Sequence, residues 1–165
     1  DGLMLSFFSP LVYIQIAPNL LTLKNLKTGL EISEVAEIAL SLPPKPKVIL
    51  GAGAQARLAS ASEPAQLIQP FAHPRSLVSD FASAEALIRI QLQRVLGKGW
   101  LRVAPSVVMH PLGNPDGGFT QVELRAFREM ALGAGASTAR VWTGRPLANH
   151  ELLSDQAALS GGKWE

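Results

Sequence analysis

Residues 120–136 constrain the fold more than any other stretch of the chain. They begin with Thr120 and Glu123 at the spacing of a capping box. In such a box the threonine hydroxyl accepts a hydrogen bond from the backbone amide of the glutamate, and the glutamate carboxylate accepts one from the backbone amide of the threonine. Apolar side chains then recur at helical spacing, and a glycine lies near the end: Val122, Ala126, Phe127, Met130 and Gly133. This pattern predicts an amphipathic helix with one buried face.

The predicted helix follows a strand and a turn-rich loop. Residues 103–110 are apolar and are interrupted at Pro105, and residues 113–118 contain the glycines and proline of a loop. After the helix, residues 140–143 predict another strand. A strand, a helix and a strand in succession are typical of an α/β domain.

The N-terminal part of the chain follows a different pattern. Residues 11–16 are apolar and β-prone, residues 21–25 alternate with period two, and residues 32–40 predict a third strand. Turns at Pro18 and Gly29 separate the three segments. We therefore expect a mixed sheet in which an antiparallel three-strand meander precedes alternating helices and strands.

Between these two parts, residues 48–50 predict a short strand, residues 52–59 a short helix, and residues 60–77 a proline-containing loop. A longer helix is predicted next, with Asp80 or Ser79 as its capping residue. Its apolar positions recur every three or four residues, at Phe81, Ala84, Ile88, Leu92 and Val95, and Gly97 suits its end. Near the C-terminus, residues 148–159 predict a last helix, and residues 160–165 a flexible tail.

Composition limits the classes of function. The chain has 165 residues, 47% of them hydrophobic, which suits one domain that buries roughly 70% of its unfolded surface. It has no cysteine, which excludes disulfides and thiolate chemistry. The net charge of +2 and the scattered lysines and arginines argue against a nucleic-acid partner. No apolar run reaches the roughly 18 residues of a membrane-spanning helix. The lack of cysteine is compatible with the cytoplasm, so we expect a cytoplasmic protein, with a place at the inner face of the membrane as an alternative.

A few residues are candidates for ligands or interfaces. His73, His110 and His150 lack the spacing of metal ligands, so we expect no metal site. Residues 1–9 are read as an apolar N-terminal tip or as a remnant of cloning or cleavage. The tip could pack on a partner or dip into a membrane. The interface candidates are Leu3, Leu5, Phe7, Phe8, Trp100 and Trp164.

The order of motifs resembles the MreB family of bacterial actin homologues, the rod shape-determining proteins. The most specific segment is residues 118–129 with Gly133-Ala-Gly-Ala136, and residues 50–56, 68–71, 77–81 and 104–108 agree with it in order and spacing. The resemblance implies an actin-like (ribonuclease H-like) domain over residues 10–159. The family normally duplicates this domain, and this chain contains one copy.

The residues that would form the family's first phosphate loop differ from its pattern. MreB proteins have an Asp-x-Gly-Thr type of loop, and the matching residues here include Gln15, Ala17 and Pro18. Gln15 offers a neutral oxygen where Mg²⁺ prefers a carboxylate. Ala17 adds a methyl group, and Pro18 has no backbone N–H to donate to a phosphate. We therefore expect no cofactor, and neither ATP nor Mg²⁺ at this position.

Two motifs each have two readings. Glu123 matches the family's water-positioning glutamate, but Thr120 and Glu123 also form the capping box, which we favour. Residues 51–56 resemble a dinucleotide-binding turn, but the acidic residue expected about 20 positions later on a further strand is missing. A close-packed turn between a strand and a helix is the better reading.

These features lead to one expectation and one alternative. The chain is expected to be an MreB-like interaction or scaffold protein without ATPase activity. It would contact a protein partner or form a homo-oligomer, with a possible peripheral membrane contact. The resemblance links it to cell shape or cell-envelope organisation. The alternative is a residual ATP-binding or phosphohydrolase module that uses Glu123.

Overall fold

The computed structural model describes residues 9–73, 80–99, 103–154 and 160–165. Its main feature is a six-stranded mixed sheet in the order β3-β2-β1-β7-β8-β9. The first three strands are β1 (Leu11–Ile16), β2 (Leu20–Asn25) and β3 (Glu31–Val35), and they form the predicted antiparallel meander. On its other side β1 runs parallel to β7 (Ser106–Pro111), which in turn runs parallel to β8 (Thr138–Gly144). The expected fold class is confirmed.

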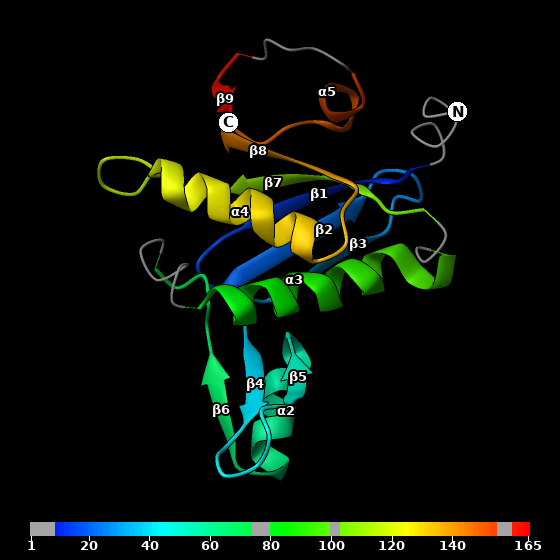
Figure 1. Ribbon diagram of the computed structural model, residues 1–165. Helices are drawn as coiled ribbons and strands as arrows, with labels where there is room; N and C mark the ends of the chain where they lie inside the picture. Colours follow the sequence, from blue (N-terminus) through cyan, green and yellow to red (C-terminus); the bar gives the residue numbers. More distant parts are fainter. Residues whose placement is uncertain (1–8, 74–79, 100–102, 155–159) are drawn as a thin grey trace.

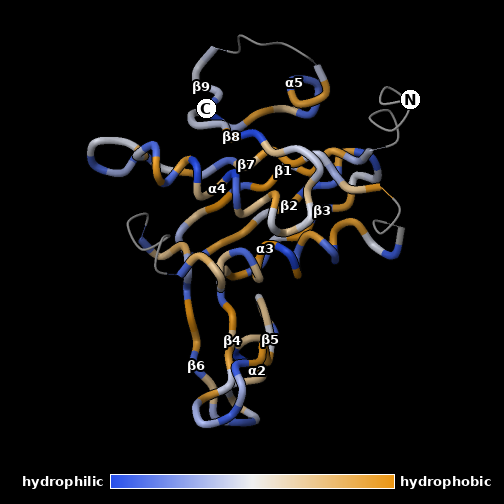
Figure 2. The backbone as a smooth tube through the Cα atoms, in the orientation of Figure 1, coloured by the Kyte–Doolittle hydropathy of each residue, from blue (hydrophilic) through white to orange (hydrophobic). Residues whose placement is uncertain are grey.

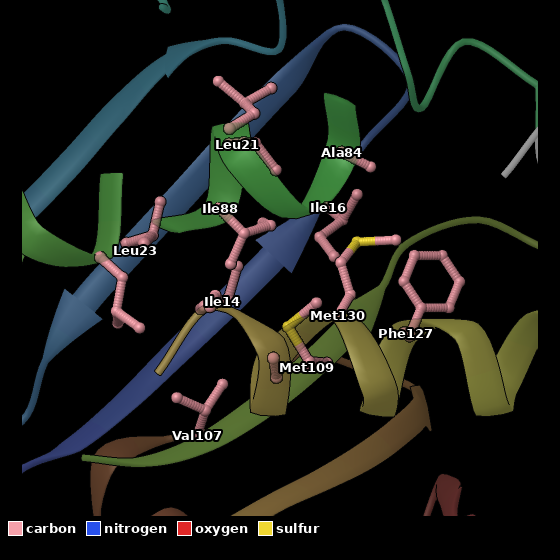
Figure 3. Packing of buried hydrophobic residues seen from close by; sticks show 14 of the residues in the cluster. Ile14, Ile16, Leu21, Leu23, Ala84, Ile88, Val107, Met109, Phe127 and Met130 are labelled. Carbon is pink, nitrogen blue, oxygen red and sulfur yellow. The ribbon is translucent and has the colours of Figure 1, made fainter. Parts of the chain in front are cut away.

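Helices α3 (Phe81–Leu96) and α4 (Gln121–Gly133) cover one face of this sheet (Figure 1). Figure 3 shows side chains from both helices meeting those of β1, β2 and β7 in the main core. Because side chains alternate along a strand, Ile14 and Ile16 point into this core and Tyr13 points to the opposite face. Short helix α5 (Asn149–Leu153) and strand β9 (Gly162–Trp164) contribute Leu152 and Trp164 to that opposite face.

A small lobe projects from the main body (Figure 1). It contains a three-stranded sheet in the order β5-β4-β6, together with α2 (Ala54–Ser62). The strands are β4 (Ile38–Ser41), β5 (Ile49–Ala52) and β6 (Ala65–Ile68). Figure 2 shows hydrophobic residues along β4, whose four residues are all buried.

The third predicted strand, residues 32–40, was wrong as one element. It divides into β3 and β4, which belong to different sheets. The chain turns between them, where the amide of Ala36 donates to Asn19 O at 3.1 Å and that of Glu37 to Val35 O at 2.9 Å. Both halves have β-prone sequences, so the local pattern did not mark the break.

Four other local predictions also need correction. The expected loop of residues 60–77 contains β6, and the expected flexible tail contains β9, which pairs with β8. Asp80 occupies the N-cap of α3 but makes no side-chain capping bond, although Gly97 ends the helix as predicted. A 3-10 turn, η2 (Gly97–Gly99), follows. The last helix ends at Leu153, and residues 155–159 of its predicted range lie outside the described part.

Candidate functional site

The turn between β1 and β2 stands where the resemblance places a phosphate loop. The amide of Ala17 donates to Leu20 O at 2.9 Å, and that of Leu20 donates back to Ala17 O at 3.4 Å. Pro18, between them, has no amide hydrogen. At two positions where a phosphate would need donors, the Ala17 amide is therefore used within the hairpin and Pro18 has none.

Side chains fill the space beside this turn. Phe71, Phe119 and Phe127 contribute to its lining, together with Ile16, Ala17, Pro18, Pro111 and Leu112. The ring of Phe127 lies 6.4 Å from that of Phe71 and 6.0 Å from that of Phe119, measured between centroids. The remaining cavity is about 30 Å³, which leaves room for a few water molecules at most. This apolar lining suits neither a triphosphate nor a hydrated cation.

Gln15 and Glu123 are separated by the sheet. Gln15 is two residues from Tyr13 on β1 and so shares its face, opposite Ile14 and Ile16. Helix α4, which carries Glu123, packs on the Ile14 face through Leu124 and Met130. The structure does not bring these two site candidates together.

Glu123 forms the capping box that the sequence predicted. Its carboxylate accepts from the amide of Thr120 at 2.9 Å, and the Thr120 hydroxyl accepts from the amide of Glu123 at 3.2 Å. The Glu123 side chain is buried. The helix lies rotated from its predicted face, because Val122 is 63% exposed while Leu124 and Ala131 are buried.

The glycine-rich turn at residues 51–56 holds a carboxylate of this chain. Glu34 Oε2 accepts from the amide of Ala54 at 3.3 Å, from Gln91 Nε2 at 3.1 Å, and from Arg94 at 2.9 Å. Gly53 has a φ of 62°, and a side chain there would collide with Glu34. The turn therefore packs closely on β3 and α3, as the second reading of the motif predicted, and the Glu34 carboxylate lies where a dinucleotide-binding turn would hold phosphate.

His110 lies at the centre of a buried hydrogen-bond chain. It is fully buried, its Nε2 lies 2.9 Å from Gly144 O, and its Nδ1 lies 2.5 Å from the Tyr13 hydroxyl. Because a carbonyl can only accept, Nε2 carries the hydrogen, Nδ1 accepts, and Tyr13 donates. The Tyr13 oxygen also accepts from the amide of Leu147 at 3.2 Å. The structure thus makes His110 part of the core that fixes the end of β8.

Arg145 links the segments that follow β8. Its guanidinium forms a two-point ion pair with Glu151, at 2.9 and 2.5 Å, and its Nε donates to Ser160 O at 2.8 Å. The pKa of Glu151 is lowered to about 2, mainly by the hydrogen bonds that Arg145 donates to its carboxylate. These contacts link the end of β8 to α5 and to the strand that follows.

The interface candidates have different outcomes. Leu3, Leu5, Phe7, Phe8 and Trp100 lie outside the described residues, so their roles stay predictions. Trp164 is half-buried. The centroid of its ring lies 5.0 Å from the centroid of the Trp142 ring and 3.8 Å from the Arg140 guanidinium.

Within the described ranges, no group of three or more His, Asp or Glu side chains could hold a metal ion. None of the helices in those ranges is long and apolar enough to cross a membrane.

Comparison with solved structures places this geometry in a known fold. No family model and no curated relative matches the sequence. MreB 5 of Spiroplasma citri bound to AMPPNP matches with a TM-score of 0.60 and 14% identity over 81% of this chain and 38% of that one. The ADP-bound form of that protein gives a TM-score of 0.59 at the same identity and coverage.

A non-polymerising mutant of MamK bound to AMPPNP also matches, with a TM-score of 0.60, 11% identity, and coverage of 81% of this chain and 40% of that one. The chain thus spans about two fifths of the length of the structures it resembles. The likeness covers the six-stranded sheet together with the smaller antiparallel sheet. The chain therefore has an actin-like fold of the kind seen in MreB 5 and MamK.

Proposed function

We propose that this protein is a non-catalytic, MreB-like interaction module that works by contact with other protein chains. The observation that carries the proposal is the β1–β2 turn. Its Ala17 amide is bonded within the hairpin, Pro18 has none, and three phenylalanines contribute to the wall beside it. An actin-like ATPase needs this turn to approach phosphate with its backbone. The family resemblance supports a role in cell shape or envelope organisation.

Self-association is the simplest form of that contact. Five large apolar side chains of the small lobe are exposed: Leu42, Val48, Ile49, Leu58 and Leu67. The outer strands β5 and β6 each have one neighbour in the described sheet. Exposed apolar residues and open strand edges both favour association with another chain.

Calorimetric titration with Mg-ATP tests the non-catalytic part. We expect no saturable heat up to about 1 mM nucleotide, which would leave any affinity weaker than about −4 kcal/mol. An Ala17→Gly/Pro18→Gly variant serves as a control. It restores an amide and removes a methyl group, yet it should also fail to bind, because Phe71 and Phe119 still fill the space. Saturable binding by the wild-type protein would favour the residual ATPase with Glu123 as its catalytic group.

A further inference from the structure

The outer edge of β8 is only partly covered. Residues 138–141 pair with β7 on one side, whereas β9 pairs on the other side with residues 142–144 only. The last bond of that ladder runs from the amide of Glu165 to Val141 O at 2.9 Å. Because backbone groups alternate along a strand, Ala139 turns its N–H and C=O toward the same outer edge. In the described part of the chain, no strand pairs with that half of the edge.

A groove lies beside this open edge. Its volume is about 410 Å³, and it is lined by residues of the first two turns of α4, by Val141 of β8 and by Glu165, which follows β9. Leu124 and Val141 give it an apolar floor, and Arg125 and Arg128 of α4 line it as well. Val141 and Ala139 point to the α4 side of the sheet, so a strand added here would turn alternate side chains onto that floor.

The charges around the groove are mainly positive. Arg125 and Arg128 are exposed, and neither forms an ion pair with another described residue. On the other face of β8, the Arg140 guanidinium lies over the ring of Trp164. The acidic side chain in the groove is Glu165, and Lys163 pairs with it at 3.2 Å. An added strand would therefore meet guanidinium groups on both of its faces.

We infer that this groove binds an extended acidic peptide segment of a partner protein, which adds as a strand to the open half of β8. Pairing with the Ala139 backbone would provide main-chain hydrogen bonds, a small apolar side chain would contact Leu124 and Val141, and carboxylates on both faces would meet Arg125, Arg128 and Arg140. Strand addition at an open sheet edge is a general mode of peptide recognition. The chain already uses it once, since β9 covers the adjoining half of the same edge. This inference rests on the proposed function and specifies the partner's chemistry.

The test uses a blocked synthetic peptide with a central valine flanked on each side by glutamates. Binding is followed by calorimetry and by tryptophan fluorescence, with Trp164→Phe to assign the signal. The double variant Arg125→Glu/Arg128→Glu should weaken binding by about tenfold or more, as expected when rim charges oppose the ligand. The matched control is Lys45→Glu/Lys47→Glu, which makes the same change in net charge in the exposed loop of the small lobe and should change the affinity less than about twofold.

Two control peptides separate strand pairing from simple charge attraction. A lysine version of the peptide should not bind. A version with proline in place of the valine should lose about tenfold in affinity, because proline cannot donate to a strand ladder. Equal binding of the proline peptide, equal losses in the two double variants, or no saturable binding up to about 1 mM would overturn the inference. If the arginine variant melts early, Arg125→Gln/Arg128→Gln replaces it and should still lose at least about threefold.

Two further readouts assign the outcome. If the peptide dissociates a self-associated form of the protein, the open edge of β8 binds a second copy of this chain. That result would contradict an acidic partner protein. The Mg-ATP titration is run on the same preparation. If both nucleotide and peptide bind, the proposed non-catalytic function is rejected and the peptide site stands. If neither binds, the peptide site is rejected and the proposed function stands.

Discussion

Glu123 is the residue at which the two functional readings separate. Its carboxylate is engaged in the capping box with Thr120. Because glutamine can replace glutamate in such a box, Glu123→Gln should change the free energy of unfolding by less than about 0.5 kcal/mol, whereas Glu123→Ala should lower it by about 1 kcal/mol. Urea unfolding measures this difference. If the wild-type protein released phosphate from Mg-ATP and both variants abolished this release, Glu123 would have a catalytic role in addition to its capping role.

His110 makes stability depend on pH. Burial lowers its pKa below the ordinary value of 6.5, although the bond to Gly144 acts in the other direction. The unfolded chain then takes up a proton near pH 6.5 that the folded chain binds only at lower pH, so the free energy of unfolding should fall as pH drops below about 6.5. Glu151, with its pKa of about 2, stays ionised across this window.

Urea unfolding at about pH 7.5 and about pH 5 measures this slope. A His110→Gln variant should lose the His110 part of it, while remaining able to donate to Gly144 O. An unchanged slope in that variant would show that other groups cause the dependence. Burial is also the first cause that raises the pKa of Tyr13, so its hydroxyl remains a donor to His110 throughout this range.

At the scale of elements, the start of α2 depends on Gly53. Its φ of 62° and the nearby Glu34 carboxylate exclude a side chain, so Gly53→Ala should lower the free energy of unfolding by roughly 2 kcal/mol or more. Gly117→Ala is the matched control, because Gly117 has a φ of 79° but open space around it, and it should cost only about 1 kcal/mol. Chemical denaturation compares the two. Equal losses would show that backbone strain, and not the Glu34 contact, is the cause.

Strand β9 packs on its neighbours through the side chain of Trp164. Trp164 packs on Trp142 and beneath Arg140, while its backbone adds a short ladder to β8. Trp164→Ala should therefore lower the free energy of unfolding by roughly 1–2 kcal/mol and increase hydrogen exchange at residues 142–144. Trp164→Phe, which keeps an aromatic ring, should lose less. Unchanged exchange in Trp164→Ala would mean that the ladder persists without the ring.

At the scale of the whole molecule, the small lobe offers the apolar surface for self-association. Leu67→Lys places a charge on the outer strand β6, where the leucine is 42% exposed, and should shift the protein toward monomer at least about threefold in sedimentation velocity. Leu153→Lys, on α5 in the main body and 65% exposed, should have no such effect. Addition of ATP should leave the wild-type distribution unchanged. A monomeric wild-type protein at all concentrations would contradict the self-association proposal.

The sequence was sufficient for features set by local chemistry. The capping box of Thr120 and Glu123, the β1–β2–β3 meander and the end of α3 at Gly97 follow from spacing and turn residues, and the structure confirms them. The loss of a backbone donor at Pro18 was also readable directly. These features depend on neighbours in the chain, so one sequence determines them.

Tertiary structure alone decided which distant residues meet. Residues 32–40 looked like one strand, but β4 separates from β3 because β5 and β6 give it a second sheet. Phe71 and Phe119 lie far apart in sequence, and only folding brings both to the turn at Pro18. Likewise Tyr13, His110 and Leu147 form one hydrogen-bond chain across three segments. Local pattern reports propensity and periodicity, whereas burial of these groups depends on long-range packing that no short window of the sequence contains.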